Sequence, residues 1–195
     1  MRYCGVVSAN QLLQLAMLEE LRTPEPPIRL DAAFFEPASA AQVARELRGL
    51  GEVVVAIAGP QVAGGGRLCD HLLRERGVAP EALHPEVGHL YRELHDLGVF
   101  TPAPEQADVT EGPVPEGTFR QAPVFETHAD GIFCALQGRR LPARRHPLGV
   151  QMRIDELTED HVMDQGGDLW HRRIEEIDAA AAALCAHRYA VGHAS

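Results

Sequence analysis

Apolar positions in the first third of the chain are spaced as they are in β-strands. Residues 3–9 are apolar and β-branched, and residues 28–35 alternate apolar with charged side chains, so a strand is predicted in each segment. Residues 53–58 form an unbroken apolar run, typical of a central strand buried on both faces. Residues 10–21 are ambiguous, because their composition favours a helix and their position between two strands favours a strand.

Helical spacing follows these strands. Ser39 is a candidate N-cap for a helix with apolar positions at Val43 and Leu47. The last helix has apolar residues three and four apart from Trp170 to Leu184. Further helices are predicted at residues 68–73, 87–98, 131–136 and 148–157, with a strand at 123–127. Early strands followed by strand–helix alternation indicate an α/β protein with one mixed sheet and helices on its faces.

Length and composition fit one soluble domain over residues 1–195, since 45% of the residues are hydrophobic and 24% are charged. Residues 101–121 are rich in proline and acids and are expected to form a flexible loop. No apolar run approaches the roughly 20 residues of a membrane helix, and no signal-peptide core follows Met1. We therefore expect a cytoplasmic protein that does not enter a membrane.

The basic residues are all arginine, which excludes a Walker A lysine, a pyridoxal Schiff base and a lysine nucleophile. The net charge of −10 argues against broad nucleic-acid binding, so a polyanion would need a local patch. The candidate phosphate-binding residues are Arg139, Arg140, Arg144 and Arg145, with Arg67 in the glycine-rich loop 64–67. Pairing of the four clustered arginines with the protein's own acids is an equal alternative, and residues 64–67 could be only a flexible connection.

Two groups of acids suggest a metal centre. Residues 124–130 are interpreted as a strand with Glu126, His128 and Asp130 on one face. The last helix carries Glu175 and Asp178 on a polar stripe that begins at His171, next to an alanine run that permits close approach to a sheet. Such ligands suit a divalent cation, with Mg²⁺ or Mn²⁺ favoured by carboxylates and Zn²⁺ by histidine. Polar side chains that simply face water would give the same pattern.

These residues together resemble the domain of unknown function 429 family, whose members are regarded as predicted nucleases with a ribonuclease H-like fold. The resemblance rests on Arg67-x-Cys69-Asp70-x-x-x-Arg74, Glu126-x-His128, Ala135-Leu136-x-Gly138-Arg139-Arg140-Leu141-Pro142, Gly149-x-x-x-Arg153 and Glu176-x-Asp178-Ala179. It implies a five-stranded mixed sheet with antiparallel first three strands, which makes residues 10–21 a strand. It also implies phosphodiester hydrolysis with Mg²⁺ or Mn²⁺, using Glu126 and Asp178 as catalytic residues that meet at one edge of the sheet.

Two positions depart from this family's pattern. Val7 and Ala58 stand where the resemblance implies metal-binding acids on the first and fourth strands. We therefore expect nuclease activity to be weak or absent, with a divalent metal bound only if the site is active. The alternatives are a domain of the same fold that binds nucleic acid, a nucleotide or a protein without cutting, and a single-metal hydrolase built on His128 and Glu126. A homodimer is compatible with the sequence.

Overall fold

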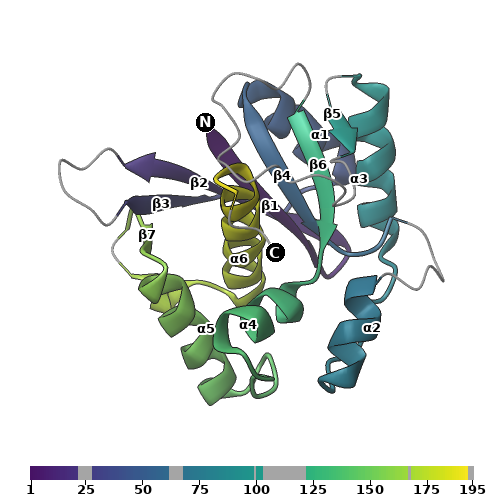
Figure 1. The fold of residues 1–195 in the computed structure, drawn as a ribbon. Coiled ribbons are helices and arrows are strands. Elements are labelled where there is room, and N and C mark those ends of the chain that lie inside the picture. The colour runs from purple at the N-terminus through teal and green to yellow at the C-terminus, as the bar shows by residue number, and fades with distance from the viewer. Residues whose placement is uncertain (22–27, 62–67, 99, 103–121, 167, 193–195) are drawn as a thin grey trace.

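The structure is a computed structural model that describes residues 1–21, 28–61, 68–98, 100–102, 122–166 and 168–192. It confirms an α/β architecture with a mixed sheet and helices (Figure 1). The elements in chain order are β1 (Arg2–Ala9), β2 (Leu12–Leu21), β3 (Arg29–Phe34), α1 (Ala40–Gly49), β4 (Val53–Ala58), α2 (Leu68–Glu75), α3 (Pro85–Asp96), β5 (Phe100–Pro102), β6 (Ala122–Thr127), α4 (Ala129–Gln137), α5 (Pro147–Glu159), β7 (Val162–Asp164), the 3₁₀ helix η1 (Leu169–His171) and α6 (Ile174–Ala190).

The sheet has the strand order β5-β6-β4-β1-β2-β3-β7. The first three strands are antiparallel, as predicted, and β4 and β6 run parallel to β1. The predicted count of five strands is wrong, because the edges gain β5 beside β6 and β7 beside β3. Each added strand has only three residues, too few for a visible alternation in the sequence.

The ambiguous segment of residues 10–21 contains β2, so tertiary pairing overrides its helical composition. A two-residue turn joins β1 to β2, and Asn10 adopts a left-handed backbone with a φ of 56°, which asparagine tolerates better than most residues. The hairpin pairs every residue of β1 with residues 12–19 of β2. Leu13 and Leu15 are then buried on one face of the sheet, and Ala16 and Leu18 on the other.

Helices cover both faces of the sheet. One face packs against α1 and α3, and the other against α6, with α4 and α5 beside it (Figure 1). The alanine run at residues 179–183 is fully buried, as predicted for close approach to the sheet. Gly5 of β1 permits this approach, because a Cβ atom there would overlap the carbonyl oxygen of Ala179 and the amide nitrogen of Ala183.

Three local predictions need correction. The strand over residues 124–130 ends at Thr127, and His128 is instead the N-cap of α4. Trp170 and His171 belong to η1 rather than to the last helix, so His171 does not share a helical stripe with Asp178. Of the predicted loop at 101–121, Thr101 and Pro102 belong to β5, and residues 103–121 lie outside the described part of the chain.

Candidate functional site

The candidate site lies where the parallel strands β1, β4 and β6 reach their carboxyl ends, beneath the start of α6. Val7 of β1 and Ala58 of β4 are register partners, and Ala58 is in turn the partner of Thr127 in β6. Val7 and Ala58 are both buried on the face that α6 covers. Tyr3 contacts His187 near the end of α6, and Gly5 contacts the middle, so Val7 lies level with the first turns of that helix.

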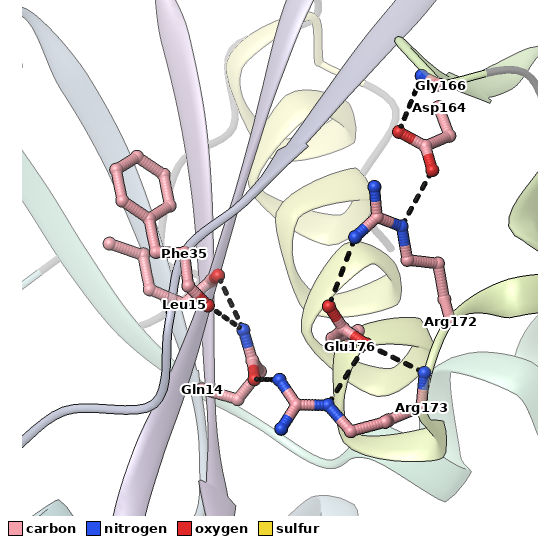
Figure 2. Close-up of polar contacts among 8 residues, drawn as sticks. All are labelled: Gln14, Leu15, Phe35, Asp164, Gly166, Arg172, Arg173 and Glu176. Atoms are coloured by element: carbon pink, nitrogen blue, oxygen red, sulfur yellow. Dashed lines mark hydrogen bonds and ion pairs between the residues drawn. The ribbon is translucent and has the colours of Figure 1, made fainter.

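A partly buried polar network fixes the beginning of α6 (Figure 2). The Nε of Arg172 donates to the Oδ2 of Asp164 in β7 at 2.6 Å, and its Nη1 donates to Glu176 at 3.3 Å. Glu176 also accepts from the backbone amide of Arg173 at 2.7 Å. Arg173 donates to the buried Gln14 of β2 at 3.3 Å. The network therefore connects the start of α6 to β2 and to the edge strand β7. Glu176, at its centre, lies two residues before Asp178.

Asp178 is fully buried and lies between two arginines. Its Oδ2 is 2.6 Å from Nη2 of Arg144, in the segment between α4 and α5. Its Oδ1 is 4.0 Å from Nε of Arg153 in α5. Both are ion pairs by distance, but among the described residues neither carboxylate oxygen has an aligned hydrogen-bond donor. The negative charge of Asp178 is therefore balanced mainly by Coulomb attraction to two guanidinium groups.

Arg153 is the most deeply enclosed cation of the site, with a relative exposure of 1%. It donates to Asp130 of α4 at 2.6 Å and to the carbonyl oxygen of Gly149 at 2.8 Å. Its guanidinium also lies over the ring of Phe133, 5.3 Å from the ring centre. Arg153 thus joins α4 and α5 and holds a positive charge beside Asp178 of α6.

Burial raises the pKa of Asp178 to about 7, against the opposing effects of Arg144 and then of Arg153. The nearby acids Asp130 and Glu81 raise this pKa further. Glu81 precedes α3 and accepts a hydrogen bond from the backbone amide of Ala129 at 3.0 Å. Two arginines and three carboxyl groups from five parts of the chain therefore share one electrostatic environment.

The side chain of Glu126 lies on the face of the sheet opposite to Asp178. Its neighbours Phe125 and Thr127 face α6, where Phe125 packs on Tyr189 and Thr127 donates to Cys185 at 3.9 Å. Because side chains alternate along a strand, Glu126 points towards the face covered by α1 and α3. There its Oε1 accepts from the backbone amide of Gln61 at 2.9 Å. The predicted meeting of Glu126 and Asp178 is therefore not found in this register.

His128 is buried and uses both ring nitrogens within the protein. Nδ1 accepts from the backbone amide of Gly131 at 3.1 Å, so the proton lies on Nε2, which is 2.9 Å from the carbonyl oxygen of Ala79. The side chain caps α4 and anchors Ala79 to it. A metal would have to break one of these two hydrogen bonds to bind His128.

The predicted arginine segment divides into two pairs. Arg144 and Arg145 pair with acids of α6, because Arg145 lies 3.3 Å and Arg144 lies 3.9 Å from the Oε1 of Glu175. Arg139 and Arg140 are exposed and have no ion pair among the described residues. Arg67 lies outside the described residues. Pairing with the protein's own acids therefore accounts for Arg144 and Arg145, and phosphate binding stays a prediction for Arg139 and Arg140.

The described residues do not fit a two-metal centre. The positions facing α6 on the first and fourth strands hold the hydrocarbon side chains of Val7 and Ala58, which have no ligand atoms. The carboxylate oxygens of Asp178 accept no hydrogen bond among the described residues, but Arg144 and Arg153 lie beside them and would repel a divalent cation. In the described part of the chain, no three His, Cys, Asp or Glu side chains are grouped to hold a metal ion.

The class of fold is supported by comparison with solved structures. The chain is similar to RuvC of Thermus thermophilus, with a TM-score of 0.51 and 14% sequence identity over 97% of this chain and 94% of that chain. The likeness supports the predicted ribonuclease H-like fold and, at this identity, concerns the fold alone. No protein-family model matches the chain, and no curated protein matches its sequence. Among the described helices, none has the length and apolar character to cross a bilayer.

The role of Arg153 is the main feature that sequence reasoning missed. Arg153 lies four residues after the buried Gly149 and four before the buried Leu157, on the inward side of α5. A cation on the buried face of a helix signals an internal partner, because burying an unpaired charge is costly. The partner itself could not be read from the sequence, since Asp130 and Asp178 lie more than 20 residues away in each direction.

Proposed function

We propose that the chain is a ribonuclease H-like domain that has lost the two-metal centre and binds a phosphate-bearing ligand without cutting it. The observation that carries this proposal is the pairing of buried Asp178 with Arg144 and Arg153. Two guanidinium groups supply the positive charge that divalent cations would otherwise bring to this carboxylate. Val7 and Ala58, on the face that α6 covers, supply no side-chain oxygen at the positions where the family resemblance implies acids.

Phosphate chemistry is supported by the arginines that the fold leaves available. Arg139 and Arg140 follow Gly138, which ends α4 with a left-handed φ of 68°, so the chain leaves the helix at once. Both side chains are exposed and have no acidic partner among the described residues. A planar guanidinium binds phosphate oxygens through paired hydrogen bonds, so a nucleic acid or nucleotide is the ligand class that fits.

A calorimetric titration with Mn²⁺ separates this proposal from the metal-dependent nuclease. We expect no saturable heat with the wild-type protein and no change in Asp178→Ala. Single- and double-stranded DNA and RNA should remain intact after incubation with Mg²⁺ or Mn²⁺. Metal-dependent cleavage that disappears in Asp178→Ala would overturn the loss of catalysis.

We also propose that the chain belongs to the domain of unknown function 429 family. In an active relative, the residues equivalent to Glu126 and Asp178 would be catalytic. The geometry favours the non-cutting alternative over the single-metal hydrolase. That hydrolase would need His128 and Glu126 on one ion, whereas His128 caps α4 and Glu126 bonds to Gln61. Zn²⁺ in the purified protein, removed by His128→Ala, would favour the hydrolase instead.

A further inference from the structure

The exposed pair Arg139 and Arg140 lies against a second basic segment that is distant in the sequence. The guanidinium Nη1 of Arg140 would lie 3.4 Å from a Cβ atom built on Gly77, so it rests on the turn that ends α2. Arg74 and Arg76 immediately precede Gly77, and both are exposed. The contact of Arg140 with Gly77 therefore brings residues 74–76 and 139–140 to one turn; we call the arginines of these two segments, Arg74, Arg76, Arg139 and Arg140, the arginine patch.

The contact between α2 and α4 holds the two halves of the arginine patch together. Leu73 of α2 packs on Gly131 in the first turn of α4, where a Cβ atom would be 2.7 Å from the Leu73 Cδ1. Gly77 has a φ of 74°, and its amide donates to the carbonyl oxygen of Arg74 at 2.9 Å. This turn closes α2 as left-handed glycines commonly do. Figure 1 shows α2 and α4 side by side at the end of the molecule towards which β6 points.

None of the four arginines of the patch has an ion pair among the described residues, whereas Arg144, Arg145, Arg153, Arg172, Arg173 and Arg188 are all paired with acids. Arg29, Arg45, Arg48 and Arg92 also have no ion pair in the described part of the chain, so this property is not confined to the patch. What distinguishes the patch is that two basic segments distant in the sequence meet at one turn, in a protein with a net charge of −10. Glu75 lies between Arg74 and Arg76 in sequence and is the acid nearest to the patch along the chain.

We propose that the arginine patch binds the phosphodiester backbone of a nucleic acid without sequence preference. This inference rests on the proposed function and names its ligand and its surface. Arginine forks recognise phosphate oxygens, and four exposed arginines in two segments that meet at one turn match a chain of repeating phosphates better than a single phosphate. None of the four residues carries an aromatic ring for base stacking, and backbone contacts carry no sequence information.

The strength of binding should depend steeply on salt. Each phosphate neutralised on duplex DNA contributes about −0.9 to the slope of log K against log salt, so four contacts give about −3.6. Affinity should then fall on the order of 100-fold between about 50 and 200 mM salt. Arg139→Ala/Arg140→Ala should flatten the slope by about 2, and removal of all four arginines should nearly abolish it.

Fluorescence anisotropy with labelled DNA and RNA oligonucleotides of two unrelated sequences tests the inference. The matched control is Arg45→Ala/Arg48→Ala, which removes the same charge from exposed positions of α1 on the other face of the sheet. It should bind as the wild type does, whereas Arg74→Ala/Arg76→Ala should lose at least about tenfold. Glu75→Gln should bind more tightly, because it removes the acid nearest to the patch in sequence.

The outcomes separate the patch from the proposed function. Wild-type binding that the Arg45/Arg48 and the patch variants weaken equally would overturn the patch, while a non-cutting binding domain would stand. No binding of wild-type protein to any oligonucleotide, with binding of ATP retained, would overturn the nucleic-acid ligand and leave a nucleotide ligand. Absence of binding to oligonucleotides, ATP and inorganic phosphate alike would overturn the proposed function itself.

Discussion

Replacement of Arg153 by methionine tests whether arginines hold the charge of Asp178 in the folded protein. Methionine keeps much of the length and the apolar contacts of the arginine stem but removes the guanidinium. The change leaves Asp178 buried with only Arg144 as a cationic partner, and it removes the guanidinium donor to Asp130 and to the carbonyl oxygen of Pro142. We expect a folded but clearly less stable protein.

The magnitude follows from the geometry. The charges of Arg153 and Asp178 are 4.0 Å apart, and both side chains are at most 2% exposed. At an effective dielectric constant of about 20, such a pair is worth about 4 kcal/mol. Removing one partner of a buried pair generally costs about 3–5 kcal/mol. Because the pKa of Asp178 is about 7, we expect the free energy of unfolding to fall by up to about 3–5 kcal/mol only well above pH 7, where this carboxyl is ionised, and by less at lower pH. The Arg153–Asp130 pair adds little, because its carboxylate is 41% exposed.

Urea unfolding followed by circular dichroism measures this change, and a double-mutant cycle assigns it. Asp178→Asn removes the charge that Arg153→Met strands, so the double variant should be more stable than the sum of the two single effects, by at least about 1 kcal/mol. Arg45→Met, at an exposed position of α1, should change stability by no more than about 0.5 kcal/mol. Additive effects of Arg153→Met and Asp178→Asn within about 0.5 kcal/mol would refute the reasoning.

Three further predictions concern packing and pH. Gly5→Val should cost at least about 3 kcal/mol in thermal unfolding, because its side chain meets the backbone of α6, whereas Gly49→Ala in α1 meets no atom within 4 Å and should be neutral or stabilising; equal melting temperatures would contradict this. Burial alone would raise the pKa of Asp164, but hydrogen bonds from Arg172 and a backbone amide lower it overall, so its stabilisation is present above about pH 4 and is lost as the pH falls further. The stability advantage of wild type over Asp164→Asn should therefore shrink in acid, and a constant difference would argue against the ion pair. The stability contribution of Asp178 changes with pH in the opposite direction, because its pKa is raised: the contribution is present below about pH 4 and is lost as the pH rises to about 7. A wild type that gains stability relative to Asp178→Asn over this range would contradict the burial effect.

The site was only partly accessible to sequence reasoning, as Glu126 and Asp178 illustrate. Both acids were identified as candidates from their spacing and from a family resemblance, and their catalytic roles remain a prediction. Whether the two acids lie on the same side of the sheet depends on β6. This strand stops at Thr127, and its register against β4 directs Glu126 away from α6. A shift of one residue in a strand exchanges the two faces, and no local pattern fixes that register.

The amino-acid sequence by itself determined the α/β class and the alanine face of the last helix, whereas the antiparallel start of the sheet was implied only by the family resemblance. The first two features follow from periodicity and side-chain size, which act over a few neighbouring residues. Only the tertiary structure decided that residues 12–21 form a strand, that Arg144 and Arg153 meet Asp178, and that Arg140 rests on Gly77. Each of these depends on charges or backbone groups brought together from distant segments, and their energies exist only once the chain has folded.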